Sequence, residues 1–237
     1  MSTKAPISVV IITQNEELNI GRCIRSCREL GDVVVIDSGS TDKTQEIAEQ
    51  LGAKVITQQW LGFGPQKKFG IDQIKTDWFL SLDADEYLTP TLLREIQSLS
   101  LDVPTQAFTL NRRSFFLGRE VRFSGWNPDW VTRIGNKNHC NFTKDVVHER
   151  LTGHEVEIPL SGLLMHNSYR SQAEVSEKTQ LYGHLGQLSR RSKKNKWITA
   201  CWAFFRTYIL RLGVLDGITG FRIASMNAKT TYIKYSD

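Results

Sequence analysis

Apolar and β-branched runs alternate with helical patterns in the first half of the chain. An alternation of this kind is typical of a parallel sheet whose faces are covered by helices. Apolar residues at helical spacing predict helices within residues 16–30 and 41–51. Strands are expected at residues 7–13, 32–38, 53–58 and 77–83. The pattern therefore predicts an α/β fold.

The second half of the chain is less regular. From about residue 103, short aromatic and arginine-rich segments predict hairpins and loops laid over the sheet. A helical pattern returns after about residue 172, and its most apolar part, 197–213, is amphipathic. We therefore divide the chain into a globular domain, 1–170, and a basic amphipathic helical tail, 171–237. The stripe expected along the tail contains Trp197, Cys201, Phe204, Phe205, Tyr208 and Leu212.

Positive charge is concentrated in that tail. The formal net charge is +5, but residues 1–169 hold 18 Lys and Arg against 21 Asp and Glu, whereas residues 170–237 hold 12 against 4. This distribution argues against a nucleic-acid-binding core and predicts an anionic partner for the tail. Arg206 and Arg211 interrupt the apolar run, which is then too short to cross a bilayer core about 30 Å thick. Residues 190–213 are expected to lie on an anionic membrane surface or to pack on the core or on a second copy of the chain.

The cysteines and the N-terminus predict a cytoplasmic protein. Cys23, Cys27, Cys140 and Cys201 lack the paired spacings of a zinc site. The first residues lack an apolar export signal. Free thiols in or near the core are therefore expected.

Three carboxylates follow the fourth expected strand within four positions. Asp83 and Asp85 are two residues apart, so on a strand they would share a face, and Glu86 follows directly. At the end of the strand, the two aspartates can converge on one divalent cation whose other ligands are phosphate oxygens. Oxygen ligands favour Mg²⁺ or Mn²⁺ over zinc. Such a cation would neutralise a diphosphate leaving group as its bond to carbon breaks.

Other segments near the strand ends also suit a nucleotide, because open α/β sheets bind ligands at the carboxyl ends of their strands. TQNEE, residues 13–17, would place polar side chains and the N–H groups of a helix start beside it. In DSGSTD, Asp37 would accept hydrogen bonds from a base or ribose, and Gly39 permits close approach of the backbone. Each segment alone would also fit a turn or a helix cap. GFGPQKK adds two cations near the expected diphosphate, Lys67 and Lys68.

Several motifs together resemble a known family. SVVIITQNEELNI, VVVIDSGSTDKT and WFLSLDADEYL, in this order and spacing, resemble the family-two glycosyltransferases of the GT-A fold, which use nucleotide-diphosphate sugars. GWNPDWVTRI, DVVHERL, MHNSYRS and LDGITGF further resemble the bacterial lipopolysaccharide inner-core β-1,4-glucosyltransferases. The resemblance implies a Rossmann-like GT-A fold with a helical C-terminal appendage. Residues 1–102 would form its nucleotide-binding half and residues 103–170 its acceptor-binding half.

The resemblance also implies roles for individual residues. Asp83 would contact the ribose or the metal, and Asp85 the metal. In several GT-A enzymes a late histidine completes the metal shell, a role that would fall to His166; a hydrogen-bonded structural role is the alternative. The residues implied to contact uridine are Thr13, Asn15, Glu17 and Asp37.

An inverting transfer further needs a base that takes the proton of the attacking acceptor hydroxyl. Many relatives place this base in a Glu-Asp pair, which the sequence lacks after residue 86. VHE supplies Glu149 as the candidate base, with His148 orienting it, and NPDW supplies Asp129 as the alternative.

Aromatic and cationic residues between the two halves suit an acceptor saccharide. Tryptophan faces fit the apolar face of a sugar ring, and arginine forks fit phosphate or carboxylate groups. Aromatic residues in irregular segments are also commonly core anchors. The candidates are Arg112, Arg113, Trp126, Trp130 and Arg133.

Together these features predict a Mg²⁺- or Mn²⁺-dependent inverting glycosyltransferase, cytoplasmic and peripheral on the inner face of the bacterial inner membrane. It would move glucose from UDP-glucose to an inner-core heptose of lipid-anchored lipopolysaccharide. Another UDP-sugar or another lipid-linked glycan acceptor is the alternative within this class. A phosphohydrolase with an Asp-x-Asp nucleophile is the second hypothesis. Such enzymes place the pair after the first strand, whereas here it follows the fourth, which argues against this hypothesis. A nucleotide-binding adaptor at the membrane surface, without catalysis, is the third hypothesis.

Overall fold

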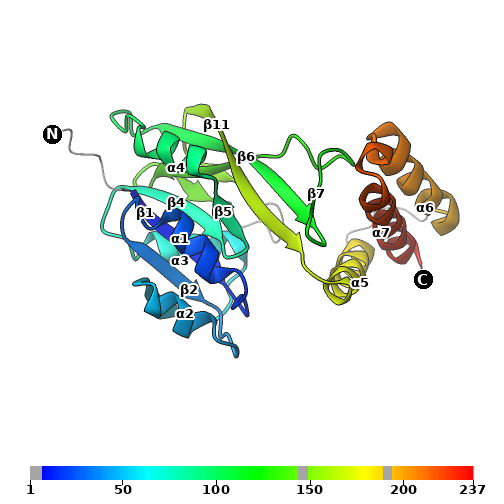
Figure 1. Ribbon diagram of the computed structural model, residues 1–237, viewed down its shortest axis with the longest axis horizontal. Helices are drawn as coiled ribbons and strands as arrows, with labels where there is room; N and C mark the ends of the chain where they lie inside the picture. The colour runs from blue at the N-terminus through cyan, green and yellow to red at the C-terminus, as the bar shows by residue number, and fades with distance from the viewer. Residues whose placement is uncertain (1–6, 144–148, 189–193, 237) are drawn as a thin grey trace. The chain divides into compact units, whose positions relative to one another are not determined.

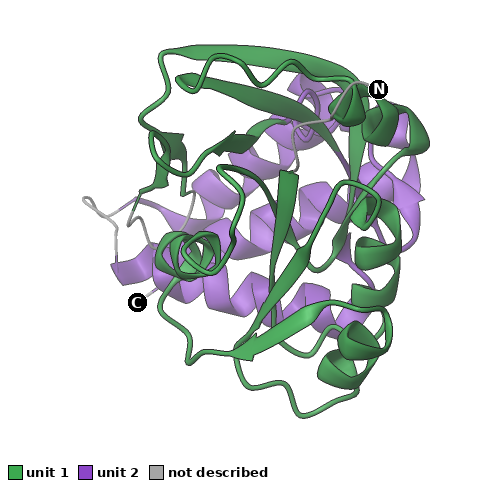
Figure 2. Cartoon of the chain, turned by 90° about the vertical axis from the view of Figure 1, so that its left-hand side faces the viewer, with its two compact units in different colours: residues 1–112, 130–166 green, residues 113–129, 167–237 purple. Residues whose placement is uncertain are grey.

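The computed structural model describes residues 7–143, 149–188 and 194–236 (Figure 1). The expectations for His148 and for residues 190–193 lie outside the described residues. The chain forms two compact units, which Figure 2 shows in different colours. Unit 1 comprises residues 1–112 and 130–166, and unit 2 comprises residues 113–129 and 167–237.

The N-terminal part of unit 1 contains the expected parallel strands and their helices. β-branched residues dominate the strands because they pack well on a pleated surface. In spatial order the parallel strands are β3 (Lys54–Thr57), β2 (Val33–Asp37), β1 (Ile7–Thr13) and β4 (Trp78–Asp83). The helices that connect them are α1 (Ile20–Cys27), α2 (Thr44–Gln50) and α3 (Phe63–Ile71).

Side chains along these strands alternate between two hydrophobic cores. In β1, Val9 and Ile11 belong to the core that includes α1, whereas Val10 and Ile12 belong to the core that includes the end of α3. Both faces of the sheet are covered, so its strands are continuous apolar runs in the sequence. α3 approaches β1 closely at Gly70, where a Cβ would lie 2.4 Å from Cγ1 of Val10.

Residues 103–166 differ from the expected hairpins laid over the sheet. They extend the same sheet in the order β4, β8, β6, β11, and β8 runs antiparallel to β4. Phe108 of β6 and Ile134 of β8 enter the core that β4 also faces. The arginine-rich stretch inside β6 interrupts its apolar alternation, so the sequence pattern does not predict one long strand there. These strands are β6 (Gln106–Phe116), β8 (Trp130–Asn136) and β11 (Val156–Tyr169).

Short elements complete unit 1. β5 (Glu86–Leu88) pairs antiparallel with β11, and β9 (Asn141–Phe142) pairs with β10 (Leu151–Thr152). α4 (Pro90–Gln97) begins after Thr89, whose hydroxyl accepts the N–H of Leu92 at 3.3 Å. Proline suits the first position of this helix because no helical N–H bond is lost there.

A glutamate of α4 binds the backbone of β11. Oε1 of Glu95 accepts the N–H of Ser161 and Oε2 accepts the N–H of Gly162, each at 2.8 Å. Burial raises the pKa of Glu95, but these N–H groups and the Ser161 hydroxyl hold it below its ordinary value. The carboxylate form of Glu95 therefore stabilises the contact between α4 and β11.

We expect Glu95→Gln to lower the free energy of unfolding by about 1–2 kcal/mol at pH 7. Because the folded-state pKa of Glu95 is depressed, its stabilisation is present above the unfolded-state pKa of about 4.3 and is lost as the pH falls through the folded-state pKa. The difference between wild type and variant in urea unfolding should therefore shrink below about pH 4. A difference that does not change with pH would contradict this role.

Unit 2 consists mainly of C-terminal helices, and the expected helical appendage is confirmed. α7 packs against α5 and α6, and Phe116, Val175 and Ile223 belong to a small buried core. β7 (Arg119–Glu120) pairs with the end of β6. None of the described helices is both long and apolar enough to cross a membrane. The helical elements are α5 (Gln172–Leu188), α6 (Lys196–Phe205), the π-helical turn η1 (Arg206–Leu210), the 3₁₀ turn η2 (Gly213–Asp216) and α7 (Ile218–Tyr235).

All four cysteines are free thiols, as expected. Cys23, Cys27 and Cys140 are buried, whereas Cys201 is exposed on α6. The pKa of the Cys23 thiol is raised by its hydrogen bond with Cys27 and by burial, so this pair behaves as core rather than as reactive thiols.

Candidate active site

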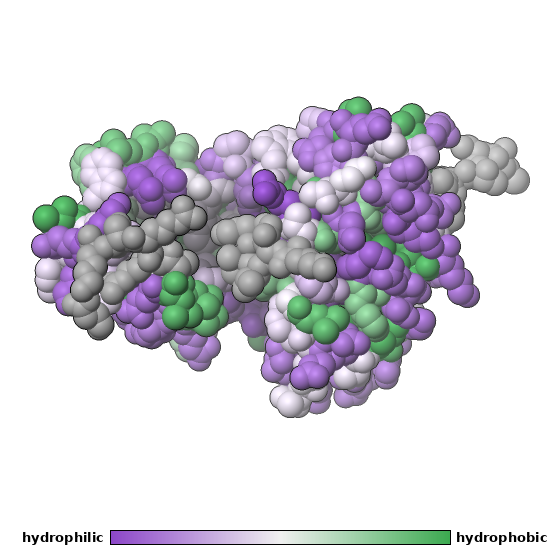
Figure 3. All heavy atoms as spheres, turned by 180° about the vertical axis from the view of Figure 1, so that it is seen from behind, coloured by the Kyte–Doolittle hydropathy of each residue, from purple (hydrophilic) through white to green (hydrophobic). Residues whose placement is uncertain are grey.

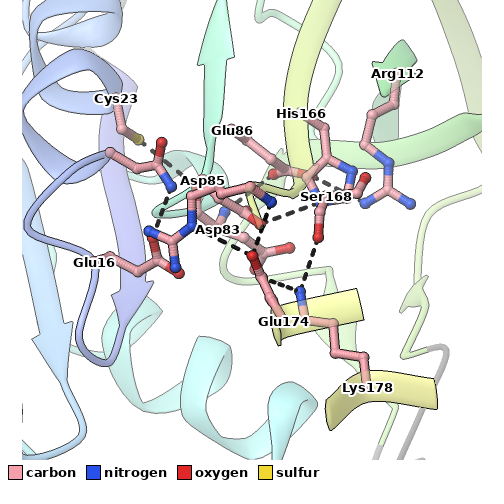
Figure 4. A network of polar contacts seen from close by, with 12 residues as sticks. Glu16, Cys23, Asp83, Asp85, Glu86, Arg112, His166, Ser168, Glu174 and Lys178 are labelled. Atoms are coloured by element: carbon pink, nitrogen blue, oxygen red, sulfur yellow. Dashed lines mark hydrogen bonds and ion pairs between the residues drawn. The ribbon is translucent and has the colours of Figure 1, made fainter. Parts of the chain in front are cut away.

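The three acids lie at a tight connection between two strands. Asp83 is the last residue of β4, Asp85 lies in the turn, and Glu86 begins β5. The pairing of β5 with β11 sets Glu86 opposite His166. Figure 4 shows the side chains of these residues gathered in one region with Arg112 of β6. Strands distant in the sequence therefore supply the surroundings of the acids.

Glu86 is a buried carboxylate bound by two arginines, and its side chain is 0% exposed. Its Oε1 lies 3.1 Å from Nη1 of Arg112 and 2.9 Å from Nη2 of Arg133. Its Oε2 accepts the N–H of Asp83 at 3.0 Å. Since a buried charge is tolerated only when it is paired and hydrogen-bonded, the two arginines account for this acid. Glu86 fixes the backbone at the end of β4.

Asp83 lies between two cations. Its Oδ1 forms an ion pair with Nζ of Lys67 at 3.0 Å without hydrogen-bond geometry, and its Oδ2 accepts a hydrogen bond from Nη2 of Arg133 at 2.9 Å. Burial raises the pKa of Asp83, but Lys67 and Arg133 hold it well below its usual range. Asp83 is therefore ionised at neutral pH.

Lys67 connects Asp83 to the candidate base. Its side chain is 0% exposed, and its Nζ lies 2.5 Å from Oε1 of Glu149. Nη1 of Arg133 lies 3.9 Å from the same oxygen, and the Glu149 side chain is 13% exposed. Glu149, expected from the VHE motif, thus lies in the same ionic network as Asp83.

Asp85 and His166 form a second contact pair. Oδ2 of Asp85 lies 3.3 Å from Nε2 of His166. Burial lowers the pKa of His166, but the Asp85 carboxylate raises it above its ordinary value. A carboxylate and an imidazole in contact are both ligands that Mn²⁺ accepts. Across the described ranges no group of three or more His, Cys, Asp or Glu side chains could hold a metal by itself, so diphosphate oxygens would have to complete the shell.

The charges of this network nearly balance, which explains how so many acids lie together. Three lysine or arginine cations face four carboxylates among the residues just described, and protonation of His166 would make the numbers equal. The cations are Lys67, Arg112 and Arg133, and the carboxylates are Asp83, Asp85, Glu86 and Glu149.

The loops after β1 and β2 are held together by reciprocal hydrogen bonds. N–H groups of the first loop donate to side chains of the second, and side chains of the first accept N–H groups of the second. This cross-linking orders two strand ends before any ligand binds. The donor–acceptor pairs are Asn15 N to Ser40 Oγ (2.8 Å), Glu16 N to Thr44 Oγ1 (2.7 Å), Glu17 N to Asp42 Oδ2 (3.1 Å), Thr41 N to Asn15 Oδ1 (2.9 Å) and Lys43 N to Glu17 Oε2 (3.1 Å).

Asp37 and Thr13 differ in whether their side-chain oxygens have hydrogen-bond partners within the described protein. Asp37 is fully buried, and its Oδ1 accepts the N–H groups of Gly39 at 2.9 Å and Ser40 at 2.8 Å. Gly39 has a φ of +88°, the region that favours glycine. The Thr13 hydroxyl is buried and has no hydrogen-bond partner in the described protein, so a ligand could supply one.

The remaining sequence candidates take part in other contacts. Lys68 forms an ion pair with Asp72, one helical turn further along, instead of joining the network. Trp130 is 47% exposed on β8. Asp129, Arg113 and Trp126 belong to unit 2, where the Trp126 ring packs against Phe116 and Tyr169 with centroids 6.1 and 6.0 Å apart.

Sequence reasoning gave no role to Glu86, although two arginines on neighbouring predicted segments were a signal for a buried acid.

Figure 4 also draws contacts within unit 2. Nζ of Lys178 donates to the carbonyl oxygen of Ser168 at 2.9 Å and lies 2.7 Å from Oε1 of Glu174. These contacts join the end of β11 to α5 and stabilise that unit.

Comparison with known proteins identifies the family. The family model described as Glycosyl transferase family 2 matches residues 8–155. The chain belongs to glycosyl transferase family 2. Membership of this family and the mixed sheet confirm the expected α/β fold of the GT-A type. They also confirm that the chain is of a transferase family, which sets aside the phosphohydrolase reading.

Individual relatives agree with this family. A protein of Rickettsia bellii, named an uncharacterized glycosyltransferase, is 31% identical over 244 residues, which cover 91% of this chain and 80% of that protein. Lipopolysaccharide core biosynthesis glycosyltransferase LpsC of Rhizobium meliloti is 32% identical over 143 residues, 57% of this chain and 51% of LpsC. The crystal structure of S. aureus TarS 1-349 in complex with UDP aligns with a TM-score of 0.49 at 17% identity, over 96% of this chain and 90% of that TarS fragment.

Proposed function

We propose that this family-two glycosyltransferase is a metal-dependent inverting enzyme that moves glucose from UDP-glucose to an inner-core heptose of lipopolysaccharide. The observation that carries the proposal is the network at the end of β4, where carboxylates lie beside the cations Lys67 and Arg133. Such a site suits a diphosphate with a divalent cation. The name of LpsC, similar to this chain over part of its length, supports an acceptor in the lipopolysaccharide core.

The cross-linked loops after β1 and β2 would hold the nucleoside. Thr13 offers a buried hydroxyl with no partner in the described protein, and Asn15 and Glu17 lie in the cross-linked segment. Asp37 holds the turn at Gly39 in place. Because these loops are already ordered, little conformational entropy would be lost when UDP binds.

Asp85 and His166 would hold Mg²⁺ or Mn²⁺ together with the diphosphate. When bound, the cation supplies positive charge to the leaving group. Asp83, already paired with Lys67 and Arg133, would orient the ribose side of the donor or share the metal. Lys68 is directed to Asp72, so we assign the diphosphate contact to Lys67 alone.

Glu149 would act as the base, with Asp129 as the alternative. The acceptor hydroxyl oxygen forms a bond to the anomeric carbon, the bond from that carbon to the diphosphate oxygen breaks, and the hydroxyl proton passes to Glu149. In this structure Lys67 holds Glu149 at 2.5 Å. A diphosphate would give Lys67 a third anionic partner, besides Asp83 and Glu149, and so release Glu149 for the acceptor.

The acceptor would be bound by Arg112, Trp126 and Trp130. We assign Arg133 a positioning role instead, because it is 5% exposed and already binds Asp83 and Glu86. Residues 1–170 would be the catalytic part and residues 171–237 the part that meets the membrane. Since the acceptor is lipid-anchored, we place the enzyme at the cytoplasmic face of the inner membrane.

Purified protein incubated with heptose-terminated lipopolysaccharide core and Mn²⁺ should release UDP from UDP-glucose. We expect turnover at least about tenfold faster than with UDP-galactose, UDP-N-acetylglucosamine or GDP-mannose, since a site that hydrogen-bonds a sugar hydroxyl rejects analogues lacking it. EDTA should stop the reaction, and Mg²⁺ or Mn²⁺ should restore it. If another UDP-sugar were turned over faster than UDP-glucose, that sugar would be the donor instead of glucose. Binding of UDP without turnover of any donor would favour the adaptor hypothesis.

A further inference from the structure

One face of the helices after residue 194 is apolar and exposed to solvent. Exposed apolar positions recur one, three and four residues apart along α6 and η1, which is one face of a helix. Ile198 is 69% exposed, Trp197 64% and Trp202 55%. The face continues past η1 through Leu212, Leu215, Ile218 and Phe221. Patches of hydrophobic residues at the protein surface are visible in Figure 3. We call this surface the apolar face; its α6 and η1 part is Trp197, Ile198, Trp202, Phe205, Ile209 and Leu210.

The apolar face differs from the stripe expected from the sequence. Phe204 and Tyr208 are only half-buried, and their rings pack against Phe221 with centroids 5.5 and 5.9 Å apart. Ile198 and Trp202, which the projection placed off the stripe, are exposed instead. The surface therefore extends beyond residue 213 and includes the start of α7.

The most buried positions of α6 and η1 are small residues. Ala200, Ala203 and Thr207 are buried, at 8%, 5% and 0% exposure. A Cβ on Gly220 would lie 1.8 Å from the carbonyl oxygen of Gly213, so the two backbones touch there. Helix pairs in water bury their large apolar residues. The reverse arrangement, small residues at the contact and large apolar residues outside, is typical of helices in contact with lipid.

The same region is strongly basic. Residues 194–236 hold seven Lys and Arg and a single acidic residue, Asp216. Asp216 is engaged with its own unit, because it accepts the N–H of Arg122 at 3.0 Å and the hydroxyl of Ser124 at 2.7 Å. Arg206, in η1, and Arg211, directly after it, are exposed residues of the segment that carries the apolar face, and the Arg211 side chain lies against Gly125. Their long side chains can reach anionic groups while their stems stay among apolar neighbours.

We propose that the apolar face docks on a bilayer that contains anionic lipids, with α6 lying in the plane of the interface. α6 has ten residues and is therefore about 15 Å long, half of the roughly 30 Å needed to cross the hydrocarbon. Trp197 and Trp202 suit the headgroup level, and the arginines suit lipid phosphates. The inference rests on the proposed function only for the identity of the membrane, the one that carries the acceptor.

A second copy of the chain fits this face less well. Two copies related by a two-fold axis would bring Arg206 and Arg211 of each close to the same surface of the other. With the only acid of the region already engaged, these like charges would repel one another. Anionic lipid headgroups provide the complementary charge that a second copy lacks.

Flotation of the full-length protein with vesicles tests the proposal without donor or acceptor. Vesicles of phosphatidylethanolamine and phosphatidylglycerol in a 3:1 ratio would be compared with phosphatidylcholine vesicles. We expect binding to the anionic vesicles that falls at least about tenfold for Ile198→Glu and for Trp202→Glu. The matched control is Val103→Glu, which adds the same charge at a residue that is 51% exposed in unit 1, and should bind like wild type.

The other outcomes would each overturn the proposal. Equal loss of binding in Val103→Glu would show that net charge, not this face, governs binding. Absence of binding to either kind of vesicle would reject docking, and a dimer in light scattering that Ile198→Glu converts to monomer would assign the face to a second copy. Circular dichroism of each variant checks that it is folded. Because UDP release is not measured, failure here leaves the transferase proposal to its own assay.

Discussion

Asp85→Ala is expected to lower the rate of glucose transfer by at least about a thousandfold, because it removes a charged group at the point where negative charge develops. The fold should be retained. Asp85 lies in the turn between β4 and β5, and it forms an ion pair with His166, a residue that can release its proton when the carboxylate is lost. The measurement is kcat for UDP release with saturating UDP-glucose, acceptor and Mn²⁺, together with the midpoint of thermal unfolding.

The control is Asp72→Ala, which removes a carboxylate that pairs with Lys68 on the surface of α3. Its kcat should stay within about twofold of wild type, since an exposed ion pair contributes little. If Asp85→Ala kept turnover in the presence of Mn²⁺, Asp85 would not be a metal ligand. A large loss in both variants would point to general electrostatic damage rather than to a specific site.

The parallel half of the fold could be predicted from sequence because its signals are local. Each strand is a continuous apolar run, and acids directly after a buried strand had to lie at its end. Asp83, Asp85 and Asp37 were therefore found at strand ends. The contacts that neutralise the acids are not local: Arg133 is 50 positions from Asp83, and Glu149 is 82 positions from Lys67. The pairing of Arg133 with Asp83 depends on antiparallel strand register, which periodicity does not specify. The pairing of Lys67 with Glu149 depends on where helix α3 meets a segment distant in the sequence.

The C-terminal surface shows a different limit of sequence reasoning. The projection assumed a regular α-helix from Trp197 to Leu212, but residues 206–210 form a π-helical turn. A π-helix has wider hydrogen-bonded turns than an α-helix, so it rotates the positions that follow relative to a regular projection. Leu212, two residues after the end of η1, has a φ of +55°, and η2 begins at the next residue. The helices themselves were predicted correctly. The residues on each side of them depended on a break that the composition did not signal.

Arg133→Met is expected to have the largest effect on stability, lowering the free energy of unfolding by about 3–5 kcal/mol. Nη2 of Arg133 binds both Oδ2 of Asp83 and Oε1 of Glu86, each at 2.9 Å, and the Glu86 side chain is fully buried. Without the guanidinium, the ion pairs left to these two acids among the described residues are those of Glu86 with Arg112 and of Asp83 with Lys67. Urea unfolding at pH 7 measures the loss. Lys68→Met is the matched control and should cost about 0–1 kcal/mol, because its ion pair is exposed.

Arg133→Lys separates the charge of this residue from its geometry. Lysine keeps the cation, but its single ammonium lacks the planar fork that places several N–H groups around two carboxylates. We therefore expect it to recover part of the stability lost in Arg133→Met while kcat stays depressed, since the Asp83 carboxylate would no longer be held in place. Full recovery of both quantities would mean that Arg133 acts only as a counter-charge. A loss of stability below about 1 kcal/mol in Arg133→Met would mean that the acids of β4 and β5 are balanced by solvent or by Lys67 and Arg112 alone.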